Sequence, residues 1–224
     1  KGTEKGQFKG PGDIAVNSAG DIYVADTESH SVQKFIPVVE EKNKIIPPEI
    51  IRKSPSVKNY SKCLFREKWG IHGYGDGQFI WPFSMAINKK GHIYITDCGK
   101  HNIQTFDLSG NFIKKWGMWG EGPGEFICPH GITVDSKDNV YIADFANHRI
   151  EKFDCEGNLI TTWGNRGPLE GQFNYPEGIV SDRDDNIYVS DTENHRIEKF
   201  DCEGHFIAAF GKEGGEEGQF RYPS

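Results

Sequence analysis

The sequence predicts an all-β protein, a β-propeller of four-stranded antiparallel blades, and three observations support this. A block of 47 residues recurs along the chain, each block contains four short apolar runs, and turn residues separate those runs. A fixed period of roughly 40–50 residues made of short strands is typical of propeller blades.

Each block is marked by Gly-Gln/Glu-Phe, followed by two residues and a proline. The anchor phenylalanines are 71, 47, 47 and 47 residues apart, at Phe8, Phe79, Phe126, Phe173 and Phe220. This spacing predicts blades at about 6–70, 77–117, 124–164 and 171–211, with residues 218–224 beginning a further repeat. The longer first interval predicts a surface insertion at 38–62, a segment rich in proline and charge.

Within the third block, the four predicted strands are 131–134, 140–143, 150–153 and 159–163. The second run is apolar on successive residues, which is typical of a strand buried on both faces. The third and fourth runs admit charges, so the first strand is expected innermost and the fourth at the outer edge. The aromatic residues that end the fourth strands are predicted to pack between blades: Trp69, Trp116, Trp163 and Phe210.

Composition limits the possible functions and leaves the compartment open. The net charge of −7, from 26 basic and 33 acidic residues, disfavours broad nucleic-acid binding, and no apolar run approaches the roughly 20 residues of a membrane-spanning helix. The odd number of cysteines, the lack of a CxxC pair and the distance expected between the equivalent Cys155 and Cys202 predict free thiols throughout. The five are Cys63, Cys98, Cys128, Cys155 and Cys202.

Three elements recur with little change: Gly-Gln-Phe-x-x-Pro-x-Gly-Ile at 171–179, Ile-Tyr-Val-x-Asp at 187–191 and Asp-x-x-Asn-His-Arg-Ile at 191–197. The chain thereby resembles the NHL-repeat family, and the resemblance implies a β-propeller, usually of six blades. With four full blocks present, we expect part of a larger, six-bladed propeller. A closed four-bladed ring and assembly with another chain are the alternatives.

In a meander the chain alternates ends, so the fourth-to-first and second-to-third connectors are expected on one face, here called the connector face. The repeated His30, His101, His148 and His195 are predicted to make structural hydrogen bonds, with Asp26, Asp97, Asp144 and Asp191 as local partners. His130 and Glu177 vary at the position after the repeat proline, near the central channel. The aromatic residues expected on or near this face are Trp81, Phe83, Trp119, Phe145, Tyr175 and Tyr222.

The leading hypothesis is a non-catalytic recognition or scaffolding module without a cofactor, which binds a protein, peptide or glycan through the connector face. Aromatic residues dominate binding hot spots, so Trp81, Phe83, Trp119, Phe145 and Tyr175 are candidate contacts, with His130 and Glu177 beside them.

Two other classes follow from the resemblance. NHL propellers attached to tripartite-motif ubiquitin ligases can bind RNA, although the acidic net charge disfavours RNA here. Some NHL-type amidating lyases bind zinc through channel-facing histidines, which implies His130 as a metal ligand of a lyase or lactonase-like enzyme. Zinc needs three or four ligands, and only Glu177 is a plausible second one.

Overall fold

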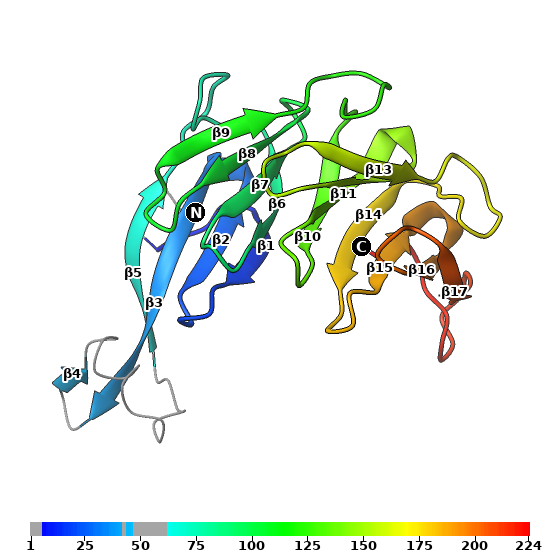
Figure 1. Cartoon of the computed structure of the whole chain (residues 1–224). Coiled ribbons are helices and arrows are strands. Elements are labelled where there is room, and N and C mark those ends of the chain that lie inside the picture. The colour runs from blue at the N-terminus through cyan, green and yellow to red at the C-terminus, as the bar shows by residue number, and fades with distance from the viewer. Residues whose placement is uncertain (1–5, 42–43, 47–61) are drawn as a thin grey trace.

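The structure, a computed structural model, describes residues 6–41, 44–46 and 62–224. In these ranges seventeen strands form four antiparallel sheets that stand side by side in an arc (Figure 1). The helices are three 3₁₀ turns, and none in the described part is long and apolar enough to cross a membrane. These turns are η1 (Thr27–Ser29), η2 (Phe145–Asn147) and η3 (Thr192–Asn194).

Each sheet is one blade, numbered here in chain order. Blade 1 contains β1 (Pro11–Val16), β2 (Ile22–Asp26), β3 (Ser31–Glu41), β4 (Lys44–Ile46) and β5 (Lys62–Trp69). Blade 2 contains β6 (Pro82–Ile87), β7 (Ile93–Asp97), β8 (Asn102–Phe106) and β9 (Phe112–Trp116). Blade 3 contains β10 (Pro129–Val134), β11 (Val140–Asp144), β12 (Arg149–Phe153) and β13 (Leu159–Trp163). Blade 4 contains β14 (Pro176–Ser181), β15 (Ile187–Asp191), β16 (Arg196–Phe200) and β17 (Phe206–Phe210).

Blades 2 to 4 pair their strands in chain order, which is the predicted meander. The first strands contact one another in series, β1 with β6, β6 with β10 and β10 with β14, so they form the inner side of the arc. The prediction of propeller blades with the first strand innermost is confirmed.

The core lies between neighbouring blades rather than inside any one of them. Between blades 2 and 3, the Trp116 ring lies 5.7 Å from that of Tyr94 and 6.2 Å from that of Phe153. The anchor Phe126 is fully buried there, 5.8 Å from Phe153. The predicted packing of terminal tryptophans with anchor phenylalanines is therefore confirmed at this interface.

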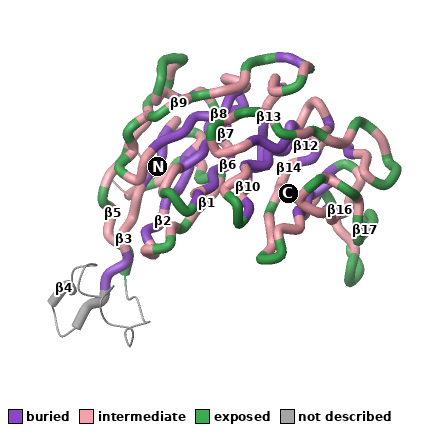
Figure 2. The backbone as a smooth tube through the Cα atoms, in the orientation of Figure 1, coloured by how far each residue is buried: buried purple, intermediate pink, exposed green. Residues whose placement is uncertain are grey.

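Burial weakens at blade 4, where no further blade follows in the described chain (Figure 2). Tyr94 and Tyr141 are fully buried, whereas the equivalent Tyr188 is only partly buried. Phe210, which ends β17 where tryptophan ends the earlier blades, is 48% exposed. The outer face of blade 4 thus has the side chains of a blade interface without a complete neighbour.

The insertion in blade 1 continues the sheet beyond the blade. Strands β3 and β5 stay paired as far as Val38 and Lys62, and β4 pairs with the end of β3. We call this extension the arm; Figure 1 shows it projecting from blade 1. The predicted insertion at 38–62 thus begins as a ribbon, and its residues 42–43 and 47–61 lie outside the described residues.

Candidate functional site

Buried aspartates at the ends of the second strands hold the backbone of the connector face in place. Asp97 accepts hydrogen bonds from the backbone N–H groups of Ile80 and Trp81, both at 3.0 Å. Asp144 accepts one from the Ile127 N–H at 2.9 Å, and burial raises the pKa of Asp144 to about 6. Each aspartate therefore ties the connector before its own blade to the turn after the second strand.

The repeated histidines connect one blade to the next. The Nδ1 atom of His101 accepts a hydrogen bond from the Cys128 N–H, and that of His148 accepts one from the Tyr175 N–H, both at 3.0 Å. His148 ends the 3₁₀ turn η2 in the left-handed conformation, with φ of 57°. The predicted structural role is confirmed, but the predicted aspartate partners are wrong, because the aspartates bond to the connector backbone instead.

An arginine braces the connector in blade 3. The guanidinium of Arg149 donates to the carbonyl oxygens of Glu121, Gly122 and Glu125, at 2.6 to 2.7 Å. It also pairs with the buried carboxylate of Glu151, whose pKa burial raises to about 7. Arg196 does the same in blade 4, so both connectors have a rigid backbone.

Four of the predicted site residues lie together along blades 2 to 4. We call them the aromatic cluster: Phe83, His130, Phe145 and Tyr175. The imidazole of His130 is stacked between Phe83 and Phe145, with ring centroids 3.9 and 4.0 Å apart. Phe145 in turn lies 4.8 Å from Tyr175. Each ring comes from a connector, a 3₁₀ turn or the first residues of an inner strand.

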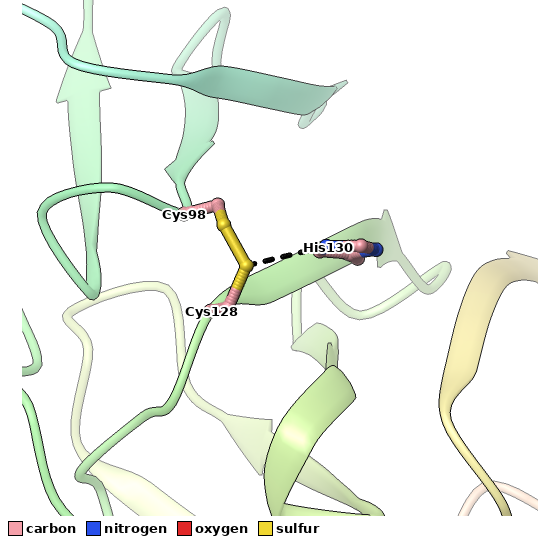
Figure 3. Close-up of side chains that lie close together, drawn as sticks. All are labelled: Cys98, Cys128 and His130. Atoms are coloured by element: carbon pink, nitrogen blue, oxygen red, sulfur yellow. Dashed lines mark hydrogen bonds between the residues drawn. A yellow bond between two sulfur atoms is a disulfide. The ribbon is translucent and has the colours of Figure 1, made fainter.

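A disulfide between Cys98 and Cys128 borders this cluster (Figure 3). The prediction that all five cysteines are free is therefore wrong for this pair, while Cys63, Cys155 and Cys202 are free. The only distance that this prediction weighed was the one between Cys155 and Cys202, in the hairpin turns of successive blades. Cys98 instead follows β7 and Cys128 precedes β10, so the two meet where the connector face of blade 2 contacts blade 3.

The disulfide occupies a position that links blades throughout the chain. The residue after each second strand reaches the segment around the next repeat proline: Thr27 donates to the Pro82 carbonyl at 2.7 Å and Thr192 to that of Pro223 at 2.8 Å. Cys98 makes the equivalent link covalently, and Phe145 makes it by ring contact. The blade 2–3 junction therefore differs chemically from the others.

His130 is 9% exposed, and burial between the two rings lowers its pKa to about 4, so the imidazole is neutral near pH 7. Its Nε2 atom lies 3.3 Å from the Cys128 sulfur. The Nδ1 atom has no hydrogen-bond partner within the described part of the chain.

Glu177 lies elsewhere. It lines a central cavity of about 740 Å³ between the inner strands, and His130 is absent from the described lining. In the described ranges, the metal-ligating side chains grouped with His130 are Cys98 and Cys128. A zinc site shared by His130 and Glu177, as the lyase hypothesis required, does not fit this structure, because His130 is directed at sulfur and not at the cavity.

The remaining aromatic candidates are exposed. Trp81 and Trp119 have 57% and 68% of their surface accessible, and Tyr222 is also exposed. Trp81 directly precedes β6, near the arc's inner side, whereas Trp119 follows β9 and lies toward the outer rim. The structure therefore divides the predicted contacts into a partly buried cluster, in which His130 is the buried member, and exposed residues on the connectors.

Sequence reasoning missed Cys98 and Cys128 as site residues. A signal was present, because each cysteine replaces a repeat position already assigned to the connector face. The disulfide itself and the stacking of His130 on Phe83 could not be inferred in that way, since both depend on how blade 3 is rotated against blade 2.

Four-stranded antiparallel blades that pair in chain order, with their first strands side by side on the inner side of the arc, define a β-propeller protein. A family model described as a 6-bladed beta-propeller matches residues 84–165. The model of the NHL repeat matches residues 8–35 and 173–200, so the chain carries NHL repeats, as its motifs predicted.

Among curated proteins, the chain is 28% identical over 115 residues to the protein brain tumor of Drosophila melanogaster, covering 50% of this chain and 9% of that protein. It is 34% identical over 59 residues to the human E3 ubiquitin-protein ligase TRIM32, covering 26% of this chain and 9% of the ligase. These matches span about a tenth of each relative.

Solved structures share the fold at low identity. Streptogramin B lyase aligns with a TM-score of 0.59 and 15% identity, over 88% of this chain and 53% of that one. Virginiamycin B lyase from Staphylococcus aureus aligns with a TM-score of 0.61 and 16% identity, over 92% of this chain and 57% of the lyase chain. U3-55K aligns with a TM-score of 0.62 and 13% identity, over 93% of this chain and 54% of the U3-55K chain. This chain therefore corresponds to just over half of each of these propellers.

Proposed function

We propose that the chain is a non-catalytic recognition module that binds a basic and apolar protein segment on its connector face. The observation that carries this proposal is that exposed apolar side chains gather on the connectors. Half of the large hydrophobic residues that are exposed in the described part lie on the connectors: Ile71, Tyr74, Trp81, Met118, Trp119, Leu169 and Tyr222.

The backbone beneath these side chains is held in place. Trp119 pairs with the fully buried Phe126 through an isolated β-bridge, and the adjoining segment is the one that Arg149 braces. Side chains presented on a rigid frame lose little freedom on binding, which favours affinity. This rigidity supports recognition by preformed aromatic contacts.

Charge supports a basic partner over RNA. The connectors at 70–81, 117–128, 164–175 and 211–222 carry seven carboxylates against three Lys or Arg residues. An acidic surface with exposed tryptophans suits Arg or Lys next to apolar residues, since a cation over an aromatic face is attracted electrostatically. Phosphate binding requires the opposite charge.

The test uses unstructured fluorescent peptides that combine Arg or Lys with apolar residues, and matched peptides with Asp or Glu in place of the bases. We expect the basic peptides alone to bind by fluorescence anisotropy. The double variant W81A/W119A should weaken binding at least tenfold, about 1.4 kcal/mol, because aromatic anchors contribute most of the binding energy.

The control is I113A/I160A, which removes exposed apolar side chains from β9 and β13 and should leave the affinity unchanged. Equal binding of acidic peptides, or an equal loss in the control, would contradict the proposal. A single-stranded RNA oligonucleotide that binds, and whose binding W81A/W119A abolishes, would assign the connector face to RNA instead.

A further inference from the structure

The junction of blades 2 and 3 brings three metal-ligating side chains together, and the proposed function uses none of them. The ligand atoms of Cys98, Cys128 and His130 lie within 4.8 Å of one another. Figure 3 shows the imidazole edge directed at the Cys128 sulfur, with Nε2 at 3.3 Å. Two thiolates and an imidazole are a donor set that binds Zn²⁺ in proteins.

We propose that, when the Cys98–Cys128 disulfide is reduced, these two cysteines and His130 hold one zinc ion between blades 2 and 3. The three protein ligands leave a fourth coordination position open. In the described ranges this is the one group of three such side chains close enough to share an ion.

The geometry needs only a small change. In a tetrahedral site with Zn–S of about 2.3 Å and Zn–N of about 2.0–2.1 Å, the sulfur and nitrogen ligands lie about 3.5 Å apart. The distance between Cys128 Sγ and His130 Nε2 is already 3.3 Å. The two sulfurs would separate from bonding distance to about 3.8 Å, which rotation of the cysteine side chains can supply.

Only the junction of blades 2 and 3 has a metal-ligating side chain at all three positions. The equivalents of Cys98 are Thr27, Phe145 and Thr192, those of Cys128 are Gly10, Trp81, Tyr175 and Tyr222, and those of His130 are Gly12, Phe83 and Glu177. A disulfide alone would account for both cysteines but not for an imidazole nitrogen aimed at one sulfur. The occurrence of all three metal-ligating side chains at one junction favours a shared role.

The surroundings hold the imidazole in place. Phe83 and Phe145 cover its two faces, at interplanar angles of 16° and 18°, so its orientation toward sulfur is restricted. The apolar rings also limit access of water, a property that tunes metal sites. Because His130 Nδ1 has no acceptor among the described residues, we expect weaker binding than in closed four-ligand sites.

The redox step balances with a dithiol as the reductant. The Cys98–Cys128 bond breaks and accepts two electrons and two protons, while the dithiol forms its own disulfide. Zinc then displaces the two thiol protons, which pass to solvent, because thiolates are the ligands. In the reverse step a disulfide accepts two electrons from the two thiolates and, with two protons, becomes a dithiol, while the Cys98–Cys128 bond forms again and the ion is released. Disulfide and zinc are therefore alternative states of one junction.

The experiment uses the whole chain in a C63S/C155S/C202S background, which removes the other thiols. After reduction by a phosphine and removal of metal, Co²⁺ is added anaerobically and then displaced by Zn²⁺. We expect a thiolate-to-cobalt charge-transfer band, one zinc per chain in competition with a chromophoric chelator, and neither signal in the oxidised chain.

The variant H130F keeps an aromatic ring between Phe83 and Phe145 but lacks the ligand nitrogen. We expect zinc affinity to fall at least tenfold and the cobalt spectrum to change, while H205A, at an exposed hairpin-turn histidine, behaves as the background. Absence of stoichiometric zinc in the reduced background would overturn the proposal. Identical affinity and spectrum in H130F would remove His130 from the site and overturn it equally.

Discussion

At the residue scale, the position after each second strand performs one task in several chemical ways. Thr27 and Thr192 donate hydrogen bonds to the carbonyl of the next repeat proline, Cys98 forms a disulfide and Phe145 contacts the Tyr175 ring at a tilt. A repeat constrains where a link between blades is made, but it leaves the chemistry of the link to the individual blade.

The disulfide should contribute to stability by restricting the unfolded chain. The two cysteines are 30 residues apart, a loop length for which the chain-entropy model gives about 3–4 kcal/mol. We expect C98S/C128S to lower the free energy of urea unfolding by about that amount under oxidising conditions. The free-thiol variant C202S is the control, and equal stability of wild type and C98S/C128S would show that the link is dispensable.

Glu151 should make stability depend on pH. Its folded pKa is raised to about 7 because it is buried, above the ordinary value of 4.5 that the unfolded chain has. The stabilisation is therefore fully present below pH 4.5 and is lost as pH rises through 7, by a total on the order of 3 kcal/mol. In E151Q the free energy of urea unfolding should vary less over this range.

The matched control for that measurement is E156Q, at an exposed hairpin turn, which should keep the wild-type pH profile. An unchanged profile in E151Q would mean that Glu151 does not titrate in this range in the folded protein.

At the scale of elements, the outer strand of each blade is fixed by its terminal aromatic residue. Trp163 packs against Tyr141 of its own blade and Phe200 of the next, with centroids 6.2 and 5.8 Å away, whereas Phe210 is half exposed. We expect W163A to cost about 3–5 kcal/mol of unfolding free energy, as for other core aromatics, and F210A to cost less than half of that. Equal losses on urea denaturation would argue against packing between blades as the main source of stability.

The strands were predictable because they depend on local pattern. In blade 3 the predicted 140–143, 150–153 and 159–163 agree with β11, β12 and β13 to within one residue. The connector face was predictable from alternation of chain direction, which placed Trp81 and Tyr175 correctly on connectors. The Cys98–Cys128 link and the stacking of His130 were not predicted, since both depend on the rotation of one blade against the next, which no local pattern encodes.

At the scale of the whole molecule, stability should decrease from the middle of the arc toward blade 4. In a stack of repeats each unit is stabilised mainly by its neighbours, so a blade with one complete interface opens more easily. All five residues of β8 are buried, whereas the equivalent β16 is only partly buried. We expect backbone amides of β16 to exchange with deuterium faster than those of β8, measured by mass spectrometry of peptic peptides.

A matched comparison is β12 of blade 3, which has neighbours on both sides and should exchange as slowly as β8. Equal protection of β16 and β8 would indicate that the outer face of blade 4 is covered in solution.

The arm of blade 1 has a consequence for how the chain could work. Strands β3 and β5 extend at the end of the blade where the hairpin turns lie, because a meander reverses direction at every strand, and the tryptophan-bearing connectors are at the opposite end. A molecule that binds the arm would leave the connectors at the opposite end of the blade uncovered. A molecule bound to the arm and a second one bound to the connectors would therefore not compete for the same surface.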